Sequence, residues 1–118
     1  MSIPNEALHK LAREIETQAI AAQQQIGLTR SQIAAKQREQ RLVRLMLGEL
    51  ADLNDDAMVY EGVGKMFALI PLPMLRRKLE LQTKDLAGDV ERLNQRLIYL
   101  ETTHKNSRVH IEQMLRPH

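Results

Sequence analysis

The sequence predicts a mainly α-helical protein, in which two long helices form an antiparallel coiled coil and are joined by a short β-hairpin that enters an oligomeric β-barrel. Apolar residues recur at intervals of three and four on both sides of the middle of the chain. Only residues 58–71 between them are patterned as strands. Aromatic residues make up 3% of the 118 residues, so the apolar 43% is mostly aliphatic. Such a composition suits a helix seam better than an ordinary globular core.

A first long helix is predicted over residues 4–53. Pro4 suits the first turn of a helix, where its missing amide is not needed, and Glu6 suits the positive end of the helix dipole. The spacing that follows is typical of a coiled coil. Its positions are Leu8, Ala12, Ile15, Ala19, Ala22, Ile26, Thr29, Ile33, Lys36, Gln40, Val43, Leu47 and Leu50. Between Leu42 and Leu53 the apolar residues point in nearly every direction, which predicts burial on all sides.

The β-hairpin is predicted over residues 58–71. Gly62 and Gly64 lie between two apolar runs, as in a tight hairpin, and Pro71 closes the second strand because proline has no amide to donate. Both faces of the second strand are apolar, with Met66, Ala68 and Ile70 on one face and Phe67 and Leu69 on the other. Two strands alone are marginal in water, and apolar edges aggregate. We therefore expect several chains to combine their hairpins in a closed barrel.

A second long helix is predicted over residues 72–116. Its repeat consists of Leu79, Thr83, Leu86, Val90, Leu93, Leu97, Leu100, His104, Ser107, Ile111 and Met114. Because a tight hairpin joins the two helices, we expect them to pair in antiparallel fashion, with Leu47 opposite Leu79. The same register places His104 and Ser107 opposite alanines, which predicts a looser seam near the chain ends.

The composition excludes several function classes. The 17 basic and 15 acidic residues are too evenly balanced to indicate nucleic-acid binding, so the basic cluster from Lys36 to Arg44 is interpreted as a solvated helix face. There is no cysteine, phosphate loop, nucleophile elbow or His-Glu-x-x-His motif. His104 and His110 are six residues apart, a spacing that does not bring two metal ligands onto one face of a helix. We expect no enzyme activity, cofactor or metal.

The sequence also predicts where the protein is found. The N-terminal residues lack the apolar region of a signal peptide, and no apolar run approaches the roughly 20 residues that cross a bilayer. We expect a soluble, cytoplasmic protein with no membrane partner.

The hairpin stretch carries a family resemblance. The residues from Val59 to Phe67 read VYEGVGKMF, a long helical pattern flanks them on each side, and the second one ends in IEQML at residues 111–115. This arrangement resembles a β-type prefoldin subunit. The resemblance covers essentially the whole chain, which would form one domain over residues 1–118, although only the hairpin stretch is specific. The chain departs from the family pattern at Pro71-Leu72-Pro73.

The resemblance implies a function and partners. It implies a heterohexamer of two α-type and four β-type subunits, with the hairpins in a double β-barrel. Prefoldin acts as a co-chaperone without ATP: it captures non-native clients of the actin and tubulin class at its coiled-coil tips and passes them to the cytosolic group II chaperonin.

Two sets of residues carry these expected roles. The expected subunit-assembly residues are Val59, Tyr60, Val63, Gly64, Met66, Phe67, Leu69 and Ile70. By the resemblance, client contact falls on Leu8, Leu11, Ile111, Met114 and Leu115.

A second interpretation is a generic coiled-coil protein for tethering or transcription, homodimeric through its helices. The central hairpin argues against it, because a simple zipper needs no glycine-containing interruption with apolar strands.

Overall fold

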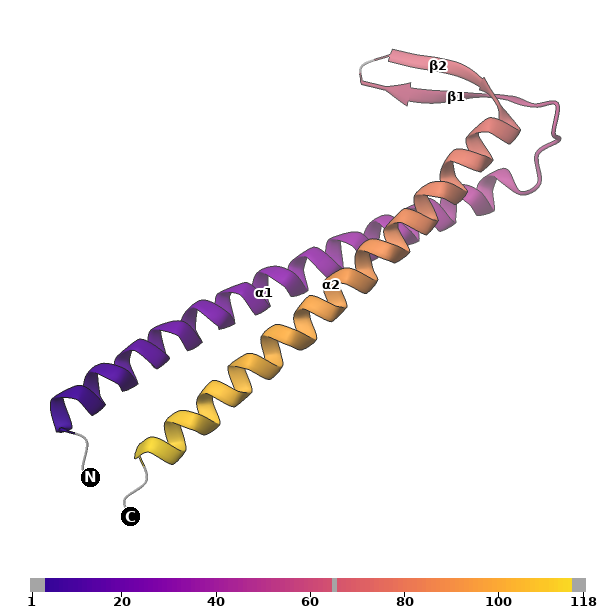
Figure 1. The fold of residues 1–118 in the computed structure, drawn as a ribbon. Helices are drawn as coiled ribbons and strands as arrows, with labels where there is room; N and C mark the ends of the chain where they lie inside the picture. The colour runs from indigo at the N-terminus through magenta and orange to yellow at the C-terminus, as the bar shows by residue number, and fades with distance from the viewer. Residues whose placement is uncertain (1–3, 65, 116–118) are drawn as a thin grey trace. The chain divides into compact units, whose positions relative to one another are not determined.

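A computed structural model describes residues 4–64 and 66–115 (Figure 1). Its elements follow in the order α1 (Asn5–Leu50), β1 (Met58–Val63), β2 (Met66–Pro71) and α2 (Leu72–Leu115). Two long helices with an antiparallel two-stranded hairpin between them confirm the predicted mainly helical fold class. Neither described helix contains a stretch long and apolar enough to cross a bilayer.

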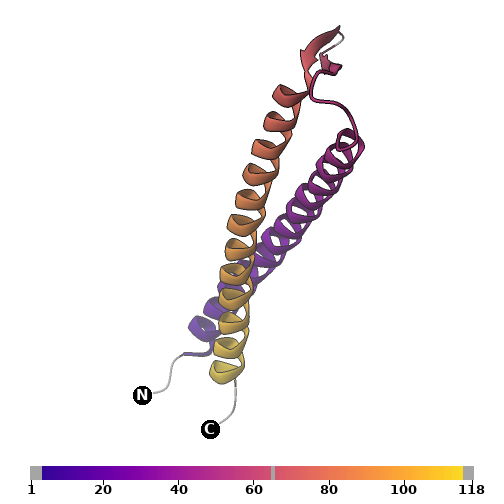
Figure 2. The same cartoon turned by 90° about the vertical axis from the view of Figure 1, so that its right-hand side faces the viewer.

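The chain divides into two compact units. The hairpin unit is Ala34–Glu91 and holds the end of α1, the hairpin and the start of α2. The terminal unit combines Met1–Ile33 with Arg92–His118, of which residues 4–33 and 92–115 are described. Within each unit, a segment of α1 and a segment of α2 run antiparallel, as the two views in Figures 1 and 2 show.

The burial of α1 follows the predicted repeat. Every position of that repeat from Leu8 to Leu50 is buried or half-buried, whereas most residues between these positions are exposed. At the start of the helix, the Leu8 amide donates to the Pro4 carbonyl at 3.0 Å. At its end, the Ala51 and Leu53 amides donate to carbonyls three residues earlier, which tightens the chain into turns before the hairpin.

The hairpin has a two-residue turn. Val63 pairs with Met66, and Gly64 in the turn has a φ of 61°, a left-handed conformation that glycine adopts without a steric penalty. Gly62 pairs with Phe67 in the same ladder. A ring carbon of Phe67 lies 3.7 Å from the place where a Cβ on Gly62 would be. The phenylalanine ring therefore lies beside the glycine, which remains exposed.

The proline-containing junction connects strand to helix without a break. β2 ends at Pro71 and α2 begins at Leu72, so Pro73 lies in the first helical turn, where its missing amide is not needed. The Leu72 amide donates to the Ala57 carbonyl at 2.9 Å and fastens this junction to the residue before β1. Leu72 is fully buried.

The core of the hairpin unit lies between the two helix segments. Val43, Leu79 and Leu86 are buried together, with Leu47, Leu50 and Leu75 packed against them. Leu47 and Leu79 therefore share one cluster, as the antiparallel register predicts. Among the described residues of the terminal unit, Ile26, Thr29 and Ile33 are buried, and the Thr29 hydroxyl donates to the Gln25 carbonyl at 2.8 Å.

One expectation is wrong for the chain alone. Residues of α1 from Leu42 onward were predicted to be buried on all sides, but Leu42 and Leu45 are exposed, at 57% and 68%. The reason is geometric, because α2 is the one helix packed against this segment and covers only the seam side. Val43, on that side, is 1% exposed.

Arg76 closes the end of α1. Its guanidinium donates to the carbonyls of Leu50 and Leu53 at 2.7 and 3.1 Å, and to Asp55 Oδ1 at 2.7 Å. The Leu50 carbonyl, which also accepts from the Leu53 amide, and the Leu53 carbonyl just after α1 thus both receive a hydrogen bond from a cation of α2. The positive charge also opposes the negative end of the helix dipole.

Candidate assembly and client surfaces

The hairpin exposes a large apolar surface. Cross-strand pairing places Val59, Val63, Met66, Ala68 and Ile70 on one face, and Met58, Tyr60, Leu69 and Phe67 on the other. Met66 and Phe67 are each 75% exposed. Moving apolar side chains out of water lowers the free energy of the system. An apolar surface this large on a two-stranded sheet indicates a site of contact with another chain.

The edges of the hairpin are also uncovered. The sheet contains two strands in the described part of the chain, so each strand has one edge whose backbone groups are not used by the ladder. Free edges with apolar side chains are templates for pairing with another chain. The hairpin therefore has both the backbone groups and the side chains that an intermolecular sheet requires.

The expected assembly residues all lie on this hairpin. Val59 pairs with Ile70 and both are half-buried, whereas Tyr60, Val63, Met66, Phe67 and Leu69 are exposed. Gly64 forms the turn. The structure thus brings the set together in one element, and its role in assembly stays a prediction.

A cleft of about 410 Å³ lies beside the hairpin. Its walls come from the end of α1, from β1 and from the start of α2. The apolar side chains of its lining are Met46, Leu50, Tyr60, Leu75 and Leu79. Lys78 on α2 forms an ion pair with Glu61 on β1 across this region. The cleft is large enough to admit side chains from another chain, and the sequence pattern did not predict it, because three separate elements form it.

The expected client residues are only partly exposed. Leu11 is exposed, while Leu8, Ile111 and Met114 are half-buried on the helix seam. Leu115 ends α2, and its side chain lies outside the described residues. Ile20 and Val109, which are not in the expected set, are exposed in the same unit. Neither residue occupies a position of the predicted repeat, so the sequence indicates that both side chains point away from the seam.

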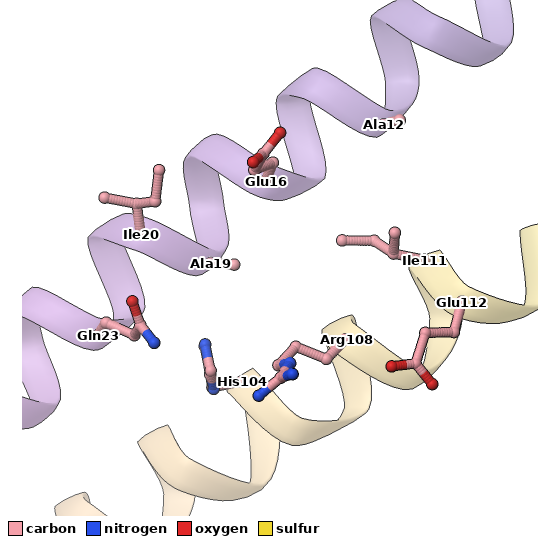
Figure 3. A pocket seen from close by; sticks show the side chains of 9 residues that line it. All are labelled: Ala12, Glu16, Ala19, Ile20, Gln23, His104, Arg108, Ile111 and Glu112. Atoms are coloured by element: carbon pink, nitrogen blue, oxygen red, sulfur yellow. The ribbon is translucent and has the colours of Figure 1, made fainter. Parts of the chain in front are cut away.

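Figure 3 shows a second cleft, of about 440 Å³, between the helix segments of the terminal unit. Ala12 and Ala19 are on its α1 side, and Ile111 and His104 point into it from α2. Glu16, Arg108 and Glu112 add charge to its lining. Alanines opposite a histidine leave the space between the helices unfilled, in agreement with the looser seam predicted there.

The described residues offer no metal centre. No group of three or more His, Asp or Glu side chains in that part of the chain gathers closely enough to hold a metal ion. Its ion pairs instead join the two helices, as between Arg30 and Glu101 at 2.8 Å and between Lys36 and Asp89 at 3.4 Å. Exposed pairs of this kind contribute little stability but favour one register.

Known proteins resemble this chain along nearly its whole length. A family model described as "Prefoldin subunit" matches residues 13–117. The chain is 35% identical over 107 residues to the probable prefoldin subunit 1 of Schizosaccharomyces pombe, covering 91% of this chain and 96% of that protein. It is 31% identical over 108 residues to prefoldin subunit 1 of Homo sapiens, covering 92% and 88%.

A solved structure shares the fold. The crystal structure of the prefoldin beta subunit from Thermococcus strain KS-1 matches with a TM-score of 0.83 and 25% identity, over 99% of this chain and 98% of that one. The stretch from Tyr60 to Phe67 predicts a resemblance to prefoldin subunit 1, and both curated relatives carry that name.

Proposed function

Because this chain belongs to the prefoldin subunit family, whose members are components of a chaperone complex, we propose that it is a β-type subunit of a heterohexamer of two α-type and four β-type subunits. The observation that carries the proposal is the uncovered hairpin, with Met66 and Phe67 each 75% exposed and both strand edges free among the described residues. Combining such hairpins in a closed β-barrel covers the apolar faces and removes the edges together.

The complex captures non-native polypeptides at the coiled-coil tips and passes them to the cytosolic group II chaperonin without ATP. Clients of the actin and tubulin class present apolar segments that a folded protein would bury. Exposed Leu11, Ile20 and Val109, together with the cleft beside Ile111, supply an apolar surface for such segments. No nucleic acid or membrane takes part, and the protein works in the cytoplasm.

The alternative function is that of a coiled-coil tethering or transcription-associated protein, dimeric through its helices. The hairpin disfavours it, because a dimer formed along the helices would leave Tyr60, Met66 and Phe67 in water.

Assembly tests the proposal directly. The chain produced alone is expected to be poorly soluble or to form ill-defined oligomers, because most of the apolar side chains on the hairpin are exposed. Coexpression with an α-type partner is expected to give one discrete hexamer in size-exclusion chromatography with light scattering. Native mass spectrometry of the tagged protein from its own cells then identifies the partners. A stable, folded monomer would rule out the proposal.

A further inference from the structure

A second uncovered surface lies on α1 before the hairpin. Arg38, Leu42, Leu45 and Glu49 follow at intervals of four, three and four, and Arg41, Arg44 and Gly48 at intervals of three and four, so these residues share one side of the helix. We call this side the outer face. It lies away from Val43, which is buried against α2.

The apolar part of the outer face has no cover within its unit. Leu42 is 57% and Leu45 68% exposed. Leucine side chains at these positions add nothing to the seam, because the seam positions on either side of them are Gln40, Val43 and Leu47. The same segment of α1 contributes Met46 and Leu50 to the cleft beside the hairpin. Two exposed leucines on this segment indicate that burial continues from the hairpin onto α1.

The outer face also carries a net positive charge, from three arginines against Glu49. Arg38, Arg41 and Arg44 make no ion pair within the described part of the chain. Of the other described cations of the hairpin unit, Lys36 pairs with Asp89, Arg76 with Asp55 and Lys78 with Glu61, whereas Arg77 and Lys84 form no ion pair either. A surface of leucines with three unpaired guanidinium groups is complementary to an apolar surface that carries carboxylates.

Gly48 adds an independent observation. Glycine weakens a helix interior relative to alanine. A Cβ built on Gly48 meets no atom within 4 Å, so nothing in the chain itself requires glycine there. Small residues allow another backbone to approach a helix closely. Gly27 is equally open but has polar residues three and four positions away, Gln23, Gln24, Arg30 and Ser31.

We propose that the outer face is a second subunit contact, on which an acidic, partly apolar surface of the neighbouring subunit docks. Leu42 and Leu45 are buried there, the arginines pair with the neighbour's carboxylates, and Gly48 admits its backbone. The proposal rests on the proposed function, because it assumes that the hairpin places a neighbouring subunit beside α1.

The test uses the full complex, produced by coexpression of the full chain with the other subunits. Gly48→Leu and the double variant Arg41→Glu/Arg44→Glu are compared with the wild type by native mass spectrometry across a salt titration. Each is expected to weaken retention of the chain in the hexamer by about tenfold or more, through steric overlap and charge repulsion respectively. Gly48→Leu does not threaten the helix itself, because leucine is the better helix former.

Two matched controls separate docking from folding. Gly27→Leu makes the same change at an equally open glycine, and Lys10→Glu/Arg13→Glu makes the same charge change on exposed residues of the terminal unit. Both are expected to assemble as the wild type does. Far-UV circular dichroism checks that every variant keeps its helix content.

The outcomes distinguish the two proposals. If Gly48→Leu and the arginine variant remain in a normal hexamer with unchanged salt dependence, the outer face is not a subunit contact, while the proposed function stands. If assembly is unchanged but the arginine variant loses binding to a double-stranded DNA oligonucleotide, the face binds nucleic acid and the inference is wrong. If the wild-type chain forms no discrete hexamer, the proposed function fails, and the inference fails with it.

Discussion

At the scale of single residues, Gly64 has the clearest backbone requirement. Its φ of 61° is left-handed, where a Cβ comes too close to the backbone. Gly64→Ala is therefore expected to destabilise the hairpin by about 1 kcal/mol. The effect is measured as a lower urea midpoint for dissociation of the hexamer.

The matched control for Gly64 is Gly62→Ala in the same hairpin. Gly62 has no positive φ, and the added Cβ would lie 3.7 Å from the Phe67 ring, an ordinary contact distance. This variant is expected to dissociate close to the wild-type midpoint. Equal losses in the two variants would contradict the role assigned to the Gly64 backbone.

Arg76, at the start of α2, donates hydrogen bonds to the backbone carbonyls of Leu50 and Leu53 at and after the end of α1. Arg76→Ala removes donors from two carbonyls at the end of α1 and from Asp55. We expect a loss of about 1 to 2 kcal/mol in the free energy of unfolding, because these bonds are charge-assisted but partly exposed. Urea unfolding followed by circular dichroism measures it.

Arg77→Ala, at the exposed neighbouring position, is the control for Arg76. This variant also removes an arginine side chain, but one that makes no hydrogen bond to α1. Its unfolding midpoint should therefore match that of the wild type. The Arg76 contacts were not predictable, because they join residues 21 to 26 positions apart across the hairpin.

At the scale of elements, the seam between the helices determines stability in the hairpin unit. Leu86 is 4% exposed and belongs to the cluster with Val43 and Leu79. Leu86→Ala is expected to cost about 2 to 4 kcal/mol, as typical for a buried leucine that leaves a cavity. Leu81→Ala, on the same helix but exposed, should cost less than about 1 kcal/mol in the same urea experiment.

The helices and the hairpin were well predicted at this scale. The intervals of three and four predicted which residues of α1 are buried, because helical periodicity is a local property of the chain. Gly64 predicted the position of the turn in the same way, whereas Gly62 lies in β1 and pairs with Phe67. The cleft beside Glu61 and Tyr60 was not predicted, because its shape depends on how the hairpin lies against two helices.

At the scale of the whole molecule, truncation tests the proposal that the hairpin assembles the complex while the helix ends bind clients. Removing the residues before Ala12 and after Val109 is expected to leave hexamer formation intact, because the hairpin unit is unchanged. Suppression of the aggregation of denatured actin should weaken, because exposed Leu11 and the half-buried apolar residues near both chain ends are removed. Light scattering measures this, with native mass spectrometry as the control for assembly.

Unchanged suppression by the truncated hexamer would place the client surface elsewhere on the complex. A loss of the hexamer itself would show instead that the chain ends contribute to assembly.

The sequence by itself determined the two helices, the hairpin between them and the prefoldin resemblance, because periodicity, glycine positions and a short specific stretch are local properties. The tertiary structure decided which apolar residues are covered. Val43 and Leu42 are neighbours in the chain, yet one is buried and the other exposed, because α2 covers one side of α1. It also decided that Arg76 closes the end of α1, and that three separate elements form a cleft beside the hairpin. These features depend on what lies opposite each residue, which the periodicity of a single helix does not contain.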